Sequence, residues 1–367
     1  MALSPFRNTS GTKSAKVMFI GEAWGKDEEE IGKPFVGQSG RELARIANEV
    51  GLIKNPLPQR YLSVKDMCNY WDGSPFIFTN VLALRPEKNN LDLLCVNKAT
   101  AGPAYPMPPL KQGKYLDPQY LPEVERLYAE INEVKPNLII ALGNTACWAV
   151  VRTTKISQIR GTTMLGHAAT KVLPTFHPAA VLRNWALRPI VKADLLKALR
   201  ESTFPEIRRP HRQVLVNPTL DEIRWWIETE GRLANYISVD IETGAGQIKC
   251  IGFAARTDFS MVVPFVNLRA NGGNYWDSLD DERIAWALVK EIMQLPAPKL
   301  FQNGMYDLQY ILRMGIVPRN CGEDTMLMHH SLFPELQKGL GFLGSIYTQE
   351  PAWKLMRGQS DVNKRDE

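Results

Sequence analysis

Residues 17–40 read VMFIGEAWGKDEEEIGKPFVGQSG. An apolar run comes first, and glycines, four glutamates and one aspartate follow it closely. Short apolar runs bounded by glycine are typical of buried strands in a parallel sheet. Polar side chains that follow such a strand lie at its carboxyl end, where doubly wound sheets bind their ligands. The stretch therefore predicts a strand that leads into a ligand site.

Three more apolar runs continue this pattern along the first half of the chain. They are FIFTNVLAL (76–84), NLIIALG (137–143) and KVLPTFHP (171–178). Segments with an apolar spacing near 3.6 residues lie between or after these runs, for example GRELARIANEVGL and PEVERLYAEINEV. Strands that alternate with helices predict a doubly wound α/β sheet. Its strand ends carry Glu22, Asn80, Asn144 and His177.

The bulk composition describes an ordinary globular protein. A chain of 367 residues, 44% of them hydrophobic and 23% charged, predicts about two or three domains. We find neither a long apolar span nor a signal-peptide core, so we expect an intracellular, cytoplasmic protein with no membrane partner. The five cysteines are scattered and odd in number, which argues against a disulfide framework and a zinc site.

Charge is distributed unevenly along the chain. Residues 1–212 carry 29 Lys and Arg against 19 Asp and Glu, whereas residues 213–367 carry 15 against 20. A basic half favours a polyanion such as nucleic acid, because phosphates attract Lys and Arg. The acidic half is either simply well solvated or able to hold metal ions with its carboxylates.

A domain boundary is predicted where proline and arginine gather, in TFPEIRRPHRQ (203–213). We place the first domain at 1–205, a linker at 206–212 and a second domain at 213–367. The second domain begins with a predicted strand QVLV (213–216) and a predicted helix LDEIRWWIETE. The strand YISVDIETG then follows.

Four motifs of the first half occur together in a recognisable order. They are GEAWGKDEEEIGKPFVG, FTNVLALRPEKNN, LGNTACWAV with IRGTTM after it, and PTFHPAAVLRN. In this order they resemble the family 4 uracil-DNA glycosylases across residues 14–205. The resemblance implies a three-layer α/β/α domain with a central, parallel, four-stranded sheet. It also implies that the protein hydrolyses the glycosidic bond of a uracil swung out of DNA.

The residues of these motifs suit that chemistry. Phe35 offers a flat face to the base, and Gly21 and Ala23 let the backbone approach it. Asn80 has the donor and the acceptor that the O4 and N3–H edge of uracil requires. His177 can donate to O2 as the departing base becomes anionic.

Acidic residues complete the predicted catalytic set. Glu22 and Glu28 match the family's acids, and Glu29 stands where an aspartate is usual. A carboxylate beside the sugar would stabilise its oxocarbenium-like transition state and orient the attacking water. No lysine in the motifs is placed to form an imine, so we expect a monofunctional enzyme that leaves an abasic site.

DNA contacts are assigned to five further residues of these motifs: Arg85, Asn144, Arg160, Leu182 and Arg183. Either Val181 or Leu182 would wedge into the vacated base stack while Arg183 meets phosphate. For both apolar residues, packing in the core is the competing interpretation.

The chain departs from the family at several points. The cysteines of the family's iron–sulfur cluster are absent, so we expect no cofactor in the first domain. Trp24 replaces the usual proline of the first motif, which leaves the pocket's shape and base preference open. An insertion used by relatives that capture DNA covalently is also missing, so no covalent adduct is expected.

The second domain places Asp240 and Glu242 two positions apart on a strand, on the same face. LFQNGMYDLQYIL follows later and places Asn303 and Asp307 one predicted helical turn apart. These motifs, with EDTMLMHHSLFPELQKGLGFLGSIYT and its Asp324 after them, resemble the 3′–5′ exonuclease of A-family DNA polymerases across 213–355.

That second resemblance implies a ribonuclease H-like α/β domain. It also implies Mg²⁺ or Mn²⁺ on Asp240, Glu242 and Asp307, and contact between substrate and Asn303.

The third motif of that family is missing. Asp361, Asp366 and Glu367 have no tyrosine in the expected position. The sequence leaves three explanations open: a fragment of a longer polymerase, a separate polymerase that completes the site, or a binding domain that does not cleave.

The sequence therefore favours a two-domain protein of the kind expected in phage replication, acting on uracil-containing DNA beside a DNA polymerase. Two alternatives stay open. The first domain senses uracil without excising it, or it grips DNA for a Mg²⁺-dependent 3′–5′ exonuclease.

Overall fold

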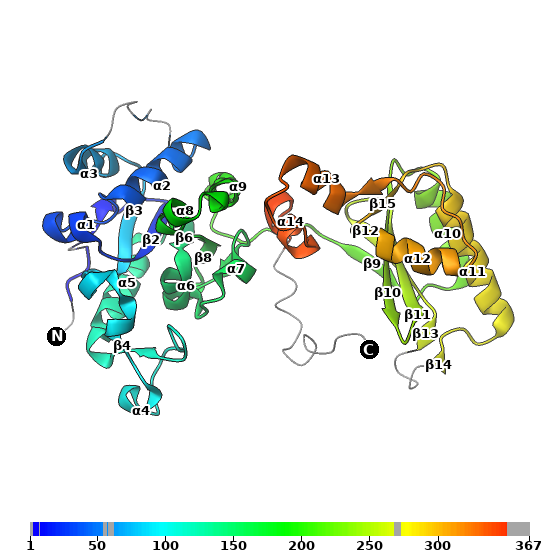
Figure 1. Cartoon of the computed structure of the whole chain (residues 1–367), viewed down its shortest axis with the longest axis horizontal. Coiled ribbons are helices and arrows are strands. Elements are labelled where there is room, and N and C mark those ends of the chain that lie inside the picture. Colours follow the sequence, from blue (N-terminus) through cyan, green and yellow to red (C-terminus); the bar gives the residue numbers. More distant parts are fainter. Residues whose placement is uncertain (1–2, 7, 54–56, 58–61, 268–272, 351–367) are drawn as a thin grey trace. The chain divides into compact units, whose positions relative to one another are not determined.

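The structure is a computed structural model that describes residues 3–6, 8–53, 57, 62–267 and 273–350. It divides into two compact units. Figure 1 colours the chain along the sequence, from blue near the N-terminus to red near the C-terminus. The first runs to Arg208 and includes a stretch that begins at Gly344, and the second runs from Arg209 to Leu343. The predicted linker contains the division at Arg208.

The first unit is built on a six-stranded sheet with the order β1-β3-β2-β6-β8-β7. Its four central strands are parallel, as predicted, and two short antiparallel strands border them. A strand of two residues is too short to show a period in the sequence, so these edges were not predicted. The strands are β1 (Ser10–Gly11), β2 (Val17–Ala23), β3 (Ile77–Leu82), β6 (Leu138–Leu142), β7 (Met164–Leu165) and β8 (Lys171–Thr175).

Helices connect these strands, and a small β4–β5 hairpin (Cys95–Val96 and Tyr115–Leu116) lies beside them. The α-helices are α1 (Lys26–Ile31), α2 (Gln38–Glu49), α3 (Val64–Asp72), α4 (Lys98–Ala101), α5 (Leu121–Val134), α6 (Gly143–Val151), α7 (Ile156–Ile159), α8 (Pro178–Arg183) and α9 (Arg188–Glu201). The 3₁₀ turns are η1 (Glu87–Asn89), η2 (Leu91–Leu94), η3 (Pro118–Tyr120), η4 (His167–Ala169) and η5 (Trp185–Leu187).

Alternate side chains of the central strands enter two separate cores. Phe19 of β2 packs among residues of α2, α3, α8 and α9, whereas its neighbour Ile20 packs with α5, α6 and α7. Both side chains are fully buried. Burial of each contributes about 1.5–3 kcal/mol. These two cores confirm the three-layer α/β/α class.

The second unit is built on a mixed six-stranded sheet with the order β16-β15-β10-β11-β12-β9. β10, β11 and β12 form an antiparallel meander, and β15 and β16 continue the sheet in parallel with β10. Its strands are β9 (Gln213–Val216), β10 (Ile237–Gly244), β11 (Gln247–Ala254), β12 (Phe259–Pro264), β15 (Lys299–Phe301) and β16 (Glu323–Asp324). A separate pair joins β13 (Val266–Asn267) to β14 (Gly273–Asn274).

Helices of this unit are α10 (Leu220–Trp226), α11 (Leu279–Gln294), α12 (Met305–Arg313) and α13 (Thr325–Leu332). The division between the units falls inside α14 (Leu340–Tyr347), whose residues from Gly344 onward belong to the first unit. The predicted helix at 220–230 continues past α10 as one π-helical turn, η6 (Ile227–Gly231). Ile237, Val239 and Ile241 of β10 are buried with α10 and α11, and the residues between them point to the other face. This alternation places Asp240 and Glu242 on one face, as predicted. The α/β class of this unit is confirmed, and the ribonuclease H-like assignment stays a prediction.

Within the described residues, no helix combines the length and the apolar character that crossing a bilayer requires.

Candidate active site

The ends of β2 and β3 bring an aromatic ring and an amide together. Gly21 pairs with Asn80 across the two strands. A Cβ at Gly21 would lie 2.2 Å from Asn80 Oδ1 and 2.7 Å from Cζ of Phe35. Phe35 and Asn80 are each only 4% exposed. Glycine is therefore required at position 21, because both predicted base-binding side chains approach its backbone closely.

Phe35 is held in a strained backbone conformation, with φ at +58°. Its carbonyl oxygen accepts a hydrogen bond of 2.8 Å from the indole N–H of Trp71. Gly40 lies so close that a Cβ there would be 1.7 Å from the same oxygen. A left-handed non-glycine residue persists only where its surroundings fix it. These contacts supply that constraint, so the Phe35 ring is pre-positioned.

Glu28 closes the loop that carries Phe35. One carboxylate oxygen accepts from the backbone N–H of Gly25 over 3.1 Å, and the other accepts from Gly37 over 2.9 Å. The residue is 8% exposed. Both oxygens of this predicted catalytic acid are thus engaged by backbone groups of the loop.

His177 caps the N-terminus of α8 at the end of β8. Its Nδ1 accepts from the backbone N–H of Ala179 over 3.1 Å, so the neutral ring carries its proton on Nε2. Burial lowers the pKa of His177, the nearby Arg183 lowers it further, and Glu22 partly opposes both. The ring is therefore neutral at pH 7. Gly143, at φ +84°, gives it room, since a Cβ there would lie 3.1 Å from the His177 Cβ.

His177 and Glu22 belong to the same site as Phe35. The His177 and Phe35 rings are 6.3 Å apart between centroids and only 26° from parallel. Glu22 acts electrostatically on His177 and accepts a 2.5 Å hydrogen bond from Thr145 Oγ1. The structure therefore brings Phe35, Asn80, His177 and Glu22 together at one edge of the sheet.

Beneath Asn80, Arg126 of α5 ties the strand to the helical layer. Its guanidinium donates to the Asn80 carbonyl oxygen over 2.6 Å and to Thr79 Oγ1 over 3.2 Å. Glu123 and Glu130 balance its charge at 2.9 and 2.6 Å. Arg126 is 2% exposed and Glu130 is fully buried. Because a buried charge is tolerated only beside its partners, this network fixes the backbone at Asn80.

The predicted DNA-binding residues divide into two groups. Leu182 is 43% exposed and Arg183 is exposed, whereas Val181 is fully buried in the core, so only Leu182 is available as a wedge. Arg85 is partly exposed and pairs with Glu29 over 3.1 Å. Asn144 uses its side-chain oxygen to accept from the backbone of Ile156 over 3.2 Å.

Arg160 corrects the sequence prediction. It is 3% exposed, and its Nε donates to Asp194 over 2.9 Å. Asp194 is itself fully buried and also accepts from Thr175 over 2.7 Å. A guanidinium committed to a buried carboxylate cannot reach a phosphate, so the DNA-binding prediction for Arg160 is wrong.

Ala23 is the last residue of β2, and Trp24 follows it directly. The backbone N–H of Trp24 donates to Leu84 over 3.0 Å, which joins the first two motifs. Among the residues that the structure describes, its buried indole N–H has no hydrogen-bond partner. The substitution for proline therefore adds a donor next to the site.

The acids of the second unit do not form a ready-made metal site. Asp307 accepts a hydrogen bond of 3.0 Å from the backbone N–H of Ile241. Burial raises the pKa of Asp307 to about 6, helped by Asp240 and Asp324. Burial and then Glu242 raise the pKa of Asp240. In the described part of the chain, no three His, Cys, Asp or Glu side chains are grouped to hold a metal ion.

Asp324 and Asn303 have structural contacts near these acids. Asp324 caps α13 and accepts from the backbone N–H groups of Asn303 and Gly304 over 3.2 and 2.8 Å. Asn303 precedes α12 with φ at +63°, so the prediction that it shares a helical turn with Asp307 is wrong. Asp361, Asp366 and Glu367 lie outside the described residues.

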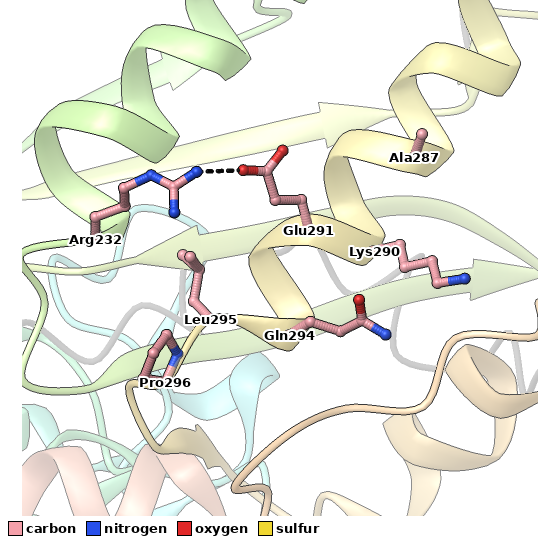
Figure 2. Close-up of a pocket in the computed structure, with 7 residues that line it drawn as sticks. All are labelled: Arg232, Ala287, Lys290, Glu291, Gln294, Leu295 and Pro296. Atoms are coloured by element: carbon pink, nitrogen blue, oxygen red, sulfur yellow. Dashed lines mark hydrogen bonds and ion pairs between the residues drawn. The ribbon is translucent and has the colours of Figure 1, made fainter.

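A hollow in the second unit lies apart from all of these groups (Figure 2). Its wall includes the ion pair of Arg232 with Glu291 at 2.7 Å, and none of the predicted site residues lines it. The hollow therefore adds no member to either predicted site.

Comparison with known proteins identifies the first unit. A family model described as the uracil DNA glycosylase superfamily matches residues 9–200. The chain belongs to this superfamily. A type-4 uracil-DNA glycosylase of Thermotoga maritima is 29% identical over 192 residues, which cover 51% of this chain and 78% of the relative. One of Saccharolobus solfataricus is 28% identical over 202 residues, covering 51% and 71%.

Solved exonuclease domains are similar at a lower level. The EXO domain of Aedes aegypti Nibbler is 12% identical, covers 40% of this chain and 73% of its own, and has a TM-score of 0.30. Brucella melitensis NrnC with bound Mg²⁺ is 13% identical, covers 42% and 72%, and has a TM-score of 0.25. The association with a phage and with an A-family polymerase stays a prediction.

The glycosylase unit does not fit the iron–sulfur cluster of the family 4 pattern. Such a cluster needs four cysteine thiolates. The five cysteines are all free, and no three metal-binding side chains gather in the described residues. The Arg126 network ties the N-terminal segment to β3 instead, because Glu130 accepts from the backbone N–H of Phe6 over 3.0 Å and from Thr79 over 2.8 Å.

Sequence reasoning missed several residues of the glycosylase site. Thr145 lies inside a quoted motif, but its contact with Glu22 depends on how β2 and α6 pack. Trp71 and Arg126 lie outside the motifs, and their side chains reach Phe35 and Asn80 only in the folded chain.

Proposed function

We propose that the first unit is a monofunctional uracil-DNA glycosylase that hydrolyses the glycosidic bond of a flipped-out uracil and leaves an abasic site. The observation that carries this proposal is the placement of Phe35 beside both Gly21, next to Asn80, and the ring of His177. An aromatic face, an amide and an imidazole donor are the groups that a flipped pyrimidine requires. The type-4 relatives support the assignment to hydrolases acting on N-glycosyl bonds, with uracil-containing DNA as substrate.

Base recognition is assigned to Phe35 and Asn80. The base stacks on the Phe35 ring, whose position is set before the substrate arrives. The Asn80 amide donates to O4 and accepts from N3–H. Cytosine presents the opposite pattern at these two positions, so one buried hydrogen-bonding group on each side would lose its partner.

Bond cleavage is assigned to His177 and Glu22. The C1′–N1 bond breaks, and its electron pair leaves with the base as a uracil anion. The Nε2–H of His177 donates to O2, where negative charge develops, and the proton stays on the imidazole. A water oxygen bonds to C1′ and releases its proton to solvent, while the Glu22 carboxylate stabilises the sugar cation. The released uracil anion then takes a proton from water.

Glu28 is assigned a different role from the one predicted. Its two oxygens hold the backbone of Gly25 and Gly37, so we propose that it positions the Phe35 loop and takes no part in the chemical step. Leu182 and Arg183 remain the proposed DNA contacts, on the basis of their exposure.

For the second unit we propose a domain that does not cleave 3′ ends by itself. Among the residues that the structure describes, Asp240, Glu242 and Asp307 do not form a group of three side chains that could hold Mg²⁺ or Mn²⁺. A DNA polymerase that completes the site stays a prediction.

The test is excision from a uracil-containing oligonucleotide by the full chain, followed by alkaline cleavage at abasic sites. The wild type should give product, and His177→Ala should lower kcat by roughly 10²–10³-fold, the loss expected for a donor to a developing oxyanion. His211→Ala is the matched control, since His211 is exposed between the predicted domains.

An intact strand at enzyme excess would reject excision by the wild type. Preferred binding of uracil-DNA over thymine-DNA without product would then favour the sensing alternative. The unpartnered indole N–H of Trp24 is the observation that keeps that alternative in view.

A further inference from the structure

The turn that follows His177 exposes two large apolar side chains. Leu182 of α8 is 43% exposed, and Trp185 of η5 is 62% exposed. Their neighbour Val181 is fully buried and fixes α8 to the core. An indole exposed to this extent contributes little to the core, so its place in the fold calls for another partner.

Trp185 is nevertheless held in place. The guanidinium of Arg188 lies 5.0 Å from the centroid of its ring. Arg188 is fixed in turn, because it donates to Glu42 over 2.8 Å and to Glu49 over 3.1 Å. The Asn184 side chain caps the turn by accepting from Ala186 over 3.2 Å. The ring is therefore supported before any ligand arrives, which lowers the entropy cost of stacking on it.

Arg183 adds a positive charge, and in the sequence it lies between His177 and Trp185. It is exposed, and no hydrogen bond or ion pair of its side chain is found among the described residues. Its charge acts on His177, so it lies near that side chain. By contrast, Glu42 and Glu49 are already neutralised by Arg188, and Lys192 adds a pair with Glu49 at 3.2 Å.

A free cation beside a supported aromatic ring is the combination that binds single-stranded nucleic acid, since the cation meets phosphate and the ring stacks a base. The six-residue α8 spans about 9 Å. That length allows Trp185, the second residue after α8, to reach the nucleotide next to the one at His177. A protein partner on this surface would be expected to neutralise Arg183 with an acidic side chain. A base that stacks on Trp185 needs no such side chain.

We propose that Trp185 is a stacking platform for the nucleobase that flanks the flipped uracil, with Arg183 on the phosphate between them. This proposal rests on the proposed function, because the flipped nucleotide sets the register. The ligand class is a base of a single strand or of a locally opened duplex. Stacking of this kind does not depend on the identity of the base.

The experiment measures binding and excision for a single-stranded oligonucleotide with one uracil and 2-aminopurine beside it. Trp185→Ala should raise Kd and KM roughly tenfold or more, while kcat changes by less than about threefold. Trp185→Phe should restore most of the affinity. Binding should quench 2-aminopurine fluorescence in the wild type and in Trp185→Phe but not in Trp185→Ala.

Trp225→Ala is the matched control, because this indole is 49% exposed in the second unit. Arg183→Gln should reduce the slope of log K against log salt by about one. Equal affinity and equal quenching in wild type and Trp185→Ala would overturn the proposal. A wild type that binds and quenches without excising would reject the proposed glycosylase activity while leaving the stacking platform supported.

Discussion

Both units carry polar motif residues on or next to their strands, but the two units differ in how the surrounding structure holds those residues in place. In the glycosylase unit, three proposed site residues are each held by a buried side chain: Asn80 by Arg126 at its carbonyl oxygen, Phe35 by Trp71, and Glu22 by Thr145. In the second unit, Asp240 and Glu242 share an open strand face, and Asp324 is engaged in capping α13. A motif thus predicts which residues are involved, whereas the packing around them decides whether a site is complete.

The largest effect is expected from removing the charge beneath Asn80. Arg126→Met leaves Glu123 and Glu130 buried without their cation, which should lower the free energy of unfolding of the first unit by about 3–5 kcal/mol. Hydrogen exchange of the β3 amides in increasing urea would measure this loss. Arg45→Met is the control, since Arg45 is 56% exposed and pairs with Glu42 at only 3.5 Å. A loss as small as that of the control would show that the glycosylase site does not depend on this network.

The next effect concerns Asp307 in the second unit. Its pKa is raised from 3.8 to about 6, so between these values the folded state binds more protons than the unfolded state. The stability of this unit should therefore fall as pH rises through that window, by about 3 kcal/mol at 1.36 kcal/mol per pKa unit. Asp307→Asn should remove this loss and stabilise the unit at pH 7.

Thermal unfolding of both proteins between about pH 3 and pH 8 would measure the difference. Asp280→Asn is the control, since the side chain of Asp280 is 86% exposed. The two curves should converge below pH 4. Stabilisation of the wild type by millimolar Mg²⁺ at pH 7, lost in Asp307→Asn, would instead reveal a complete metal site and weaken the contrast between the units.

The smallest effect tests whether Glu28 acts through Phe35. Glu28→Gln offers one acceptor oxygen, whereas two backbone N–H groups need one each. Excision should therefore fall roughly tenfold, a loss that lies within the free-energy cost of one unsatisfied buried group. In a Phe35→Leu background the same change should have almost no effect. Excision kinetics of the four proteins give this cycle, and Glu30→Gln, with 63% exposure, is the control. Additive losses would return Glu28 to the chemical step.

Much of the fold followed from local pattern. The four parallel strands coincide with apolar runs, and the two faces of β10 follow from strict alternation in ISVDIETG. Edge strands β1 and β7 have no such signal because they are two residues long. Arg160 was misassigned because its partner Asp194 lies on α9, far along the chain, and no sequence pattern links them.

The polar residues at the strand ends were recognisable in the sequence, because strand period and glycine position are local properties of the chain. Which of them are neighbours in a site and which are structural supports depends on how distant segments fold together. Arg160 and Glu28 resemble ligand-binding groups within their motifs, yet Arg160 is engaged by the buried Asp194 and Glu28 by the backbone N–H groups of Gly25 and Gly37. The physical reason is that a buried charge must be neutralised or hydrogen-bonded where it lies, and the fold alone supplies that partner.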